Sequence, residues 1–360
     1  MKSSSILTAA LGALIAIAGC TSAFASEPPA GPATAPSAAT AVVADAASTE
    51  SPGASACPPS ATDVLPKSGW ESAARRAIDR GLLWRIEKDG RTSWLYGTIH
   101  IARFDWVMPG PTVKAALQQS DTIALEINLL DAEAMKGALA SRQAEPAAKE
   151  KLLSGERGQR MARQMTLACA TDELQARLNR VQPILQAIAL TMLAGRADGF
   201  YAEFGIDIFL SAFGRSANKP VVALETVADQ MKLLGANGGS REAEQVDQML
   251  DQLESGNARR QLRELAEAWA RGDRDMLANY ADWCNCLQSS AAQRQWKRLV
   301  DDRNPGIADG IERLHASGKR VFGAVGALHM VGPRGLPGLL AQRGFTVTAV
   351  LPVGEAKAAN

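Results

Sequence analysis

Short apolar runs near both ends of the chain predict β-strands. Residues 82–87 (LLWRIE) and 92–99 (TSWLYGTI) are such runs, and residues 88–91 (KDGR) join them. Asp-Gly between two apolar runs is a strong signal for a tight turn, so the pair predicts an antiparallel hairpin. Further runs of strand length occupy residues 122–127, 220–225, 321–327 and 345–351.

Between these runs, apolar residues recur at the spacing of amphipathic helices. Residues 132–215 have helical character apart from Gly and Pro breaks, and further helices are expected at 111–120, 241–271, 307–317 and 336–343. Strands therefore alternate with helices at both ends of a helical block. The expected fold class is α/β, with a central mixed sheet that contains an antiparallel hairpin, helices on both faces and an inserted helical subdomain.

The first residues have the plan of an export signal. One Lys precedes an apolar run rich in Ala, Leu and Ile, which predicts a signal peptide over residues 1–25. Residues 17–20 (IAGC) have the form of a bacterial lipobox, in which Cys20 would be lipidated, whereas residues 23–25 (AFA) suit ordinary cleavage before Ser26. We favour a lipid-anchored protein, and a soluble periplasmic protein is the alternative. Either route exports the chain across the inner membrane to the cell envelope.

Residues 26–66 are rich in Ala, Pro, Ser and Thr and contain almost no large apolar side chains. Such a segment buries too little surface to offset the entropy of ordering it, which predicts a disordered tether. The folded part then spans residues 67–360, the size of one large α/β domain or two small ones.

Charge and cysteines narrow the environment further. The formal net charge is +1, with both signs interspersed, so we expect no nucleic-acid partner, and membrane contact only through the N-terminal lipid. Four cysteines downstream of the signal allow three full pairings, which the sequence leaves open: Cys57, Cys169, Cys284 and Cys286. We expect Cys284 and Cys286 to reach other partners rather than bridge each other, and we rank a disulfide above a metal site for this pair.

Four strand-like runs each carry one ionisable residue at or near their carboxyl end. These residues are His100, Glu126, Glu225 and His329. In open α/β sheets ligands bind outside the carboxyl ends of the strands, so the four side chains are expected to converge. A buried carboxylate is costly unless it is paired or bound to a cation, which favours a shared site.

Two of the three histidines follow a glycine by three residues. Gly97 precedes His100, and Gly326 precedes His329. Glycine permits a sharp turn, a positive φ or a close approach of another chain segment, and would aim each imidazole into a cleft. Two imidazoles and a carboxylate are ligands for a divalent transition metal, which lowers the pKa of a bound water. Taken singly, such a His or Glu is more often structural; the third histidine, His315, is expected to be a solvated residue at a helix end.

These motifs resemble the TraB/GumN family, which includes the Tiki proteins. The resemblance runs from about residue 83 to 353 and is carried by residues 95–100 (LYGTIH), 124–127 (ALEI), 205–207 (GID), 219–226 (KPVVALET), 303–304 (RN) and 325–333 (VGALHMVGP). Tiki proteins have paired GxxH motifs and are described as metal-dependent proteases. The wider superfamily resembles erythromycin esterase and a haem-binding lipoprotein of the ChaN type, with a shared α/β core.

The resemblance implies roles for individual residues. His100 and His329 match the GxxH histidines, Glu126 the first acidic position, Glu225 the acid of the LET segment, and Arg303 an arginine near the site. The expected function is a metal-dependent, protease-like hydrolase of a peptide or small molecule. His100, His329 and Glu126 would hold Mn, Co, Fe or Zn, while Glu126, Glu225 and Arg303 would contribute to catalysis. The alternatives are a non-catalytic lipoprotein that binds haem or another ligand, and a metal-free esterase.

Overall fold

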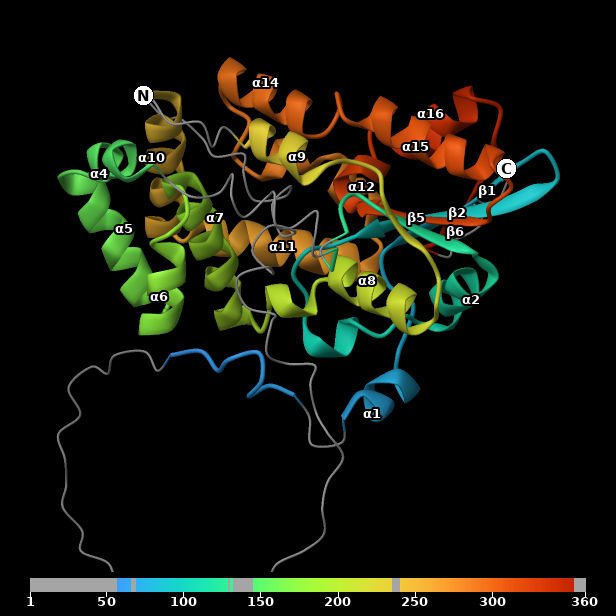
Figure 1. Cartoon of the computed structure of the whole chain (residues 1–360), viewed down its shortest axis with the longest axis horizontal. Coiled ribbons are helices and arrows are strands. Elements are labelled where there is room, and N and C mark those ends of the chain that lie inside the picture. The colour runs from blue at the N-terminus through green and yellow to red at the C-terminus, as the bar shows by residue number, and fades with distance from the viewer. Residues whose placement is uncertain (1–56, 66–68, 129, 132–144, 235–239, 353–360) are drawn as a thin grey trace, which may run out of the picture.

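The computed structural model describes residues 57–65, 69–128, 130–131, 145–234 and 240–352 (Figure 1). The predicted signal peptide, both cleavage sites and most of the predicted tether lie outside these residues. A six-stranded sheet forms the centre, in the order β4-β3-β5-β2-β1-β6. The strands are β1 (Leu82–Lys88), β2 (Arg91–Thr98), β3 (Thr122–Leu125), β4 (Val221–Ala223), β5 (Val321–Gly326) and β6 (Thr346–Leu351).

Strands β1 and β2 form the predicted antiparallel hairpin. Leu82 pairs with Gly97 at one end and Lys88 with Arg91 at the other. Asp89 and Gly90 both have positive φ, which is the backbone that a two-residue hairpin turn requires. The sequence prediction of this turn is confirmed.

Four adjacent strands of the sheet run parallel: β2 pairs with β5, β5 with β3, and β3 with β4. Strand β1 runs antiparallel to β2 on one side and to β6 on the other. Because the four parallel strands point the same way, their carboxyl ends meet at one edge of the sheet. This edge is where the sequence places its ionisable side chains.

Helices cover both faces of the sheet (Figure 1). Helix α8 (Ile206–Ser216) packs on β3 and β4, whereas α15 (Asn304–Ala316) packs on β5 and α16 (Leu336–Gln342) on β6. The mixed sheet with its hairpin and flanking helices confirms the predicted α/β class. The remaining helices near the sheet are α1 (Gly69–Arg75), α2 (Pro111–Gln119), α9 (Val227–Leu233), α12 (Arg274–Ala278), α13 (Tyr280–Trp283), α14 (Ser290–Leu299) and the 3-10 turns η3 (Phe104–Trp106), η5 (Ala202–Phe204) and η6 (Ala327–Met330).

A helical block lies beside the sheet (Figure 1). It contains α4 (Pro146–Leu152), α5 (Glu156–Leu167), α6 (Asp172–Leu178), α7 (Pro183–Ala194), the turn η4 (Gly195–Asp198), α10 (Ser240–Glu254) and α11 (Asn257–Arg271). Helix α7 is buried along almost its whole length, and α10 and α11 pack against it. The predicted helical stretch 132–215 is confirmed where the structure describes it.

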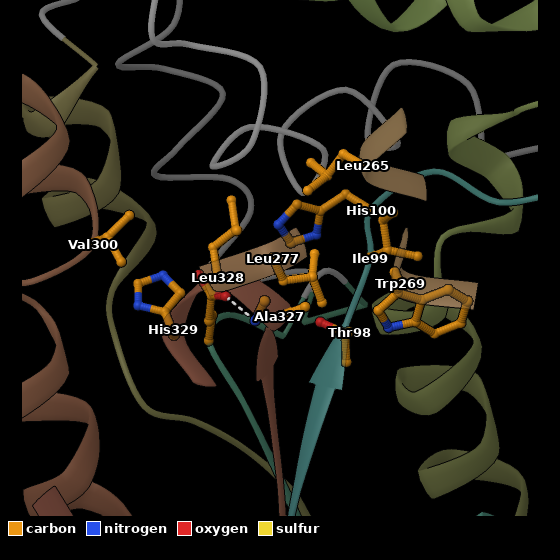
Figure 2. A pocket seen from close by; sticks show the side chains of 12 residues that line it. Thr98, Ile99, His100, Leu265, Trp269, Leu277, Val300, Ala327, Leu328 and His329 are labelled. Atoms are coloured by element: carbon orange, nitrogen blue, oxygen red, sulfur yellow. Dashed lines mark hydrogen bonds between the residues drawn. The ribbon is translucent and has the colours of Figure 1, made fainter. Parts of the chain in front are cut away.

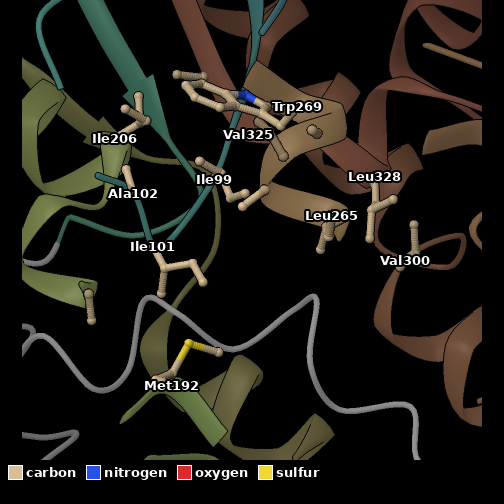
Figure 3. Packing of buried hydrophobic residues seen from close by; sticks show 14 of the residues in the cluster. Ile99, Ile101, Ala102, Met192, Ile206, Leu265, Trp269, Val300, Val325 and Leu328 are labelled. Atoms are coloured by element: carbon tan, nitrogen blue, oxygen red, sulfur yellow. The ribbon is translucent and has the colours of Figure 1, made fainter. Parts of the chain in front are cut away.

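Trp269 joins the helical block to the sheet. This fully buried side chain comes from α11, and its indole N–H donates a 2.7 Å hydrogen bond to the carbonyl of Gly97 in β2. Ile99, Val325 and Leu265 belong to the apolar cluster around it (Figure 3). None of the described helices is both long enough and apolar enough to cross a bilayer.

The prediction that Cys284 and Cys286 reach other partners is wrong. Cys284 and Cys286 form a disulfide with each other; their Cα atoms are 5.1 Å apart, and Asn285 between them takes the positive φ that closes the short ring. Cys57 pairs with Cys169, so residues 57–65, at the end of the predicted tether, are fixed to the helical block.

The prediction for His315 is also wrong, because its side chain is buried rather than solvated. Its Nδ1 lies 2.9 Å from the hydroxyl of Ser93, and its Nε2 lies 3.0 Å from the carbonyl of Lys88. The ring contacts Phe345 edge-on. His315 therefore joins α15 to the hairpin, at the opposite end of β2 from His100.

Candidate functional site

The four ionisable residues predicted at strand ends lie along one edge of the sheet. Glu225 follows β4, Glu126 follows β3, His329 follows β5 and His100 follows β2, which is the order of these strands in the sheet. Glu126, His100 and His329 are all buried. The structure thus brings together the candidate residues, and Arg303 joins them from the start of α15.

Arg303 lies at the centre of the cluster, and its side chain is only 6% exposed. Its Nη2 lies 2.5 Å from Oε2 of Glu126 and also bonds Glu225, while Nε donates to Oε1 of Glu225 at 2.9 Å. Its Nη1 donates to the carbonyl of Leu299 at 2.9 Å and lies 3.2 Å from Nε2 of His329. A guanidinium has five N–H donors, and these five contacts use all of them.

Glu126 is held by more than Arg303. Its Oε1 accepts a 2.7 Å hydrogen bond from the backbone N–H of Gly326, and Gln230 donates to its Oε2 at 3.3 Å. Burial alone would raise the pKa of Glu126, but the charge of Arg303, the two nearby imidazoles and the hydrogen bond from Gly326 together outweigh burial and hold this pKa well below its ordinary value. Glu126 is therefore an anion at all ordinary pH values, and a weak base.

His100 is oriented by Asp207 from the first turn of α8. Its Nδ1 lies 2.7 Å from Oδ2 of Asp207, and the hydroxyl of Thr98 donates to Oδ1 of the same carboxylate at 2.7 Å. A carboxylate accepts only, so Nδ1 carries the proton and Nε2 is left facing away from Asp207. Burial opposes protonation of His100, but the charge and hydrogen bond of Asp207, together with the charge of Glu126, outweigh burial and raise the pKa of His100.

His329 has a neutral anchor instead. Its Nδ1 lies 2.6 Å from the side-chain oxygen of Asn304, whose amide group in turn donates to the carbonyl of Arg334. Nδ1 is therefore the protonated nitrogen, and Nε2 accepts the hydrogen bond from Arg303. Burial and the nearby Arg303 charge lower the pKa of His329 to about 3, so this imidazole is neutral.

Both motif glycines permit close approach rather than a positive φ. A Cβ on Gly97 would lie 3.2 Å from the Cα of Ala327. A Cβ on Gly326 would lie 3.1 Å from Oε1 of Glu126 and 3.8 Å from Nε2 of His100. The missing side chains let β2 and β5 end close together, and they leave room beside Gly326 for Oε1 of Glu126 and Nε2 of His100.

A small cavity of about 30 Å³ lies where β2 and β5 end (Figure 2). Thr98, His100, Glu126 and His329 supply its polar lining, and apolar side chains supply the rest. This volume holds about two water molecules. Figure 2 shows the imidazoles of His100 and His329 approaching the cavity from the ends of different strands.

The predicted metal ligands lie close together, but their donor atoms are not arranged for a metal. Across the described ranges, no three or more His, Cys, Asp or Glu side chains form a group that could hold a metal ion. Oε2 of Glu126 and Nε2 of His329 both bond Arg303, whose positive charge stands where a cation would have to bind. The residues do not fit a metal in this arrangement, and metal binding stays a prediction.

Sequence reasoning assigned no role to three residues that complete the site: Asp207, Gln230 and Asn304. Asp207 and Asn304 lie within the motifs quoted for the family resemblance, and Gln230 follows the segment 219–226 by four residues. They come from helices α8, α9 and α15, in which the sequence does not show which polar side chains turn toward a strand end. An acidic residue at a mostly apolar helix start, as in GIDIFL, is the signal that would have identified Asp207.

The chain is an α/β protein with a site at the carboxyl edge of its mixed sheet. The site contains a buried histidine–carboxylate pair and an arginine–carboxylate cluster. Residues 82–349 match the model of the TraB/PrgY/gumN family, and the chain belongs to this family. The resemblance seen in the sequence motifs is thereby confirmed. Searches among curated proteins and solved structures found no match.

Proposed function

We propose that this chain is a hydrolase that splits an acyl bond, in a peptide or an ester, at the strand-end cavity. One observation carries the proposal. His100 lines the cavity, its Nδ1 is bound to buried Asp207, and its Nε2 has no hydrogen-bond partner among the described residues. An oriented imidazole with a free Nε2 beside a water-sized space is the arrangement of a general base.

The chain's own residues suffice for the proton transfers. Asp207 holds the proton on Nδ1, so Nε2 of His100 can accept a proton from a water in the cavity while the water oxygen attacks the carbonyl carbon. The protonated imidazole then donates this proton to the leaving nitrogen or oxygen as the acyl bond breaks. Asp207 favours the transient positive charge, in keeping with the raised pKa of His100.

Arg303, Glu126 and Glu225 serve as the rigid wall of the site in this proposal. All five donors of Arg303 are used within the protein, and the low pKa of Glu126 makes it a poor proton acceptor. Their ion pairs fix the ends of β3 and β4 against α15. The wall keeps Glu126 and His329 at fixed positions opposite His100.

A metal-dependent form of the same hydrolase is the second candidate. The favouring observation is that both imidazoles donate from Nδ1 to an anchoring side chain. Metal-bound histidines commonly do the same: one ring nitrogen binds the metal and the other donates to an anchor. His100, His329 and Glu126 would hold the ion once Arg303 released Glu126 and His329. A bound divalent ion would supply water activation.

Location in the cell envelope belongs to the proposal as well. Two disulfides support an oxidising compartment, in keeping with the export signal predicted for residues 1–25.

Hydrolysis assays on the purified mature chain test the proposal. Short-chain aryl esters and a set of unstructured peptides serve as substrates for wild type, His100→Gln and His315→Gln. The proposal expects turnover that is lost in His100→Gln and kept in folded His315→Gln. No turnover of any substrate, or equal turnover in all three proteins, would refute it.

A further inference from the structure

The cavity has two chemically different sides. Its polar lining comes from Thr98, His100, Glu126 and His329, whereas the rest of its lining includes an apolar wall. This wall consists of Ile99, Leu265, Trp269, Leu277, Val300 and Leu328. The wall side chains come from the residue after β2, from α11 and α12, from the residue after α14 and from η6, so five segments contribute to one apolar surface (Figures 2 and 3).

Polar atoms near this wall are already bonded elsewhere. The indole N–H of Trp269 donates to the carbonyl of Gly97, and the hydroxyl of Thr98 donates to Asp207. Trp269 therefore offers only its ring carbons to a ligand, and Thr98 has no proton left to donate. A ligand group on this side meets a surface suited to aliphatic carbon.

The strand-end side disfavours anions. Glu126 and Glu225 share the single guanidinium of Arg303, and Asp207 adds a third carboxylate beside His100, so the group stays negative overall even when His100 is protonated. Arg303 has no donor left for a ligand, because its five N–H groups bond Glu225, Glu126, His329 and Leu299. A carboxylate or phosphate placed here would lose its water and gain no positive partner.

We infer that the substrate group beside the scissile bond is a short, uncharged aliphatic group, and that the site rejects substrates with an anionic group at this position. The inference rests on the proposed hydrolase function, which places the carbonyl of the scissile bond beside His100. The apolar wall takes the aliphatic group, and His100 meets the carbonyl on the polar side. Esters and amides of small branched or straight aliphatic acids, and peptide bonds next to Val, Leu or Ala, belong to this class.

Binding tests the inference without any need for turnover. The probes are isovaleramide, a neutral aliphatic amide, and succinamate, an amide of similar size with a carboxylate at its far end. Protein NMR titrations of the mature chain give both dissociation constants. We expect saturable binding of isovaleramide at least roughly tenfold tighter than that of succinamate, a tenfold ratio being about 1.4 kcal/mol.

A leucine pair supplies the matched variants. Leu277 lines the cavity, whereas Leu117 on α2 is equally buried but does not line it. Leu277→Ala should widen the apolar side and move the preference toward a longer amide such as heptanamide by roughly threefold or more. Leu117→Ala should leave the ratio of the two amides unchanged, whatever its effect on stability.

The outcomes separate this inference from the proposed function. Succinamate binding as tightly as isovaleramide, no saturable binding of either probe, or the same amide preference in Leu277→Ala and Leu117→Ala would each overturn the inference. Hydrolysis that shows no preference for aliphatic over anionic substrates would overturn it while leaving the hydrolase proposal in place. Selective amide binding without any hydrolysis would support the inference and refute the hydrolase.

Discussion

Nδ1 of His100 lies 2.7 Å from Oδ2 of Asp207, and both side chains are more than nine-tenths buried. The pair joins the end of β2 to the first turn of α8, two segments separated by 107 residues. A buried carboxylate on the far nitrogen fixes the ring and its tautomer and leaves Nε2 for chemistry.

Substituting Asp207 should lower activity more than stability. In Asp207→Asn the anchor loses its charge, so Nε2 becomes a weaker base and either tautomer of His100 can be held. General base catalysis contributes about 10²–10⁴-fold, and we expect kcat to fall by about 10²-fold or more with little change in KM. Asp198→Asn is the control, because Asp198 forms an ion pair with Arg259 on the helical block. A rise in KM with kcat unchanged, or an equal loss of kcat in both variants, would count against the role of Asp207.

Removing Arg303 should strongly destabilise the fold. Arg303→Met leaves Glu126 and Glu225 without their buried cation, and breaking a buried pair from one side costs about 3–5 kcal/mol. Adding Glu126→Gln to Arg303→Met should recover part of this loss, because one fewer buried charge is unpaired. Urea unfolding measures both, with Arg320→Met as the exposed counterpart, for which a much smaller loss is expected because solvent screens this pair. If the losses in the free energy of unfolding from Arg303→Met and Glu126→Gln simply add, the predicted coupling between Arg303 and Glu126 is contradicted.

The pKa values of the two site histidines should be shifted in opposite directions in metal-depleted protein. The pKa of His329 is lowered to about 3 by burial and Arg303, so its NMR signals should not shift between about pH 5 and 9. The pKa of His100 is raised by Asp207, so its midpoint should lie above the ordinary value near 6.5. Three histidines in the chain make assignment by single substitution practical.

The sign of the linked stability follows from these shifts. Unfolded His329 binds a proton near pH 6.5 and the folded state does not until about pH 3, so this residue lowers stability as pH falls through that window. His100 acts in the opposite sense: its contribution is complete below the unfolded pKa and is lost as pH rises through the raised folded value. A pKa of His329 above that of His100 would show that the anchors of the two histidines have been assigned wrongly.

The cysteine pairing makes a separate prediction. A non-reducing digest should yield linked peptides for Cys57–Cys169 and for Cys284–Cys286. Because the first bridge closes 112 residues, Cys57→Ser with Cys169→Ser should lower the free energy of unfolding by about 2–4 kcal/mol. A peptide that links Cys169 to Cys284 or Cys286 would contradict the structure.

Sequence reasoning placed the site through features that are local in the chain. A strand-like run, a glycine and an ionisable side chain occur within a few residues of each other, and parallel strands bring such ends to one edge. His100, Glu126, Glu225 and His329 were therefore predictable, and so was the hairpin turn at Asp89 and Gly90.

Features that depend on packing between distant segments were missed. Asp207 and Asn304 act only because α8 and α15 start beside particular strand ends. Burial of His315 requires Ser93 and Lys88 of the hairpin, more than 200 residues away. The Cys284–Cys286 bridge depends on the positive φ of Asn285, which the sequence permits but does not require.

The most direct test of the account is the hydrolysis rate of metal-depleted protein, with the residual metal content measured by elemental analysis. Wild type and His100→Gln are compared on one short-chain aliphatic ester, before and after addition of Mn or Zn. The account predicts that metal-depleted wild type hydrolyses the ester and that His100→Gln is slower by about 10²-fold or more. Activity that appears only with bound metal, and disappears from wild type on depletion, would contradict a site that works through His100 and Asp207 alone.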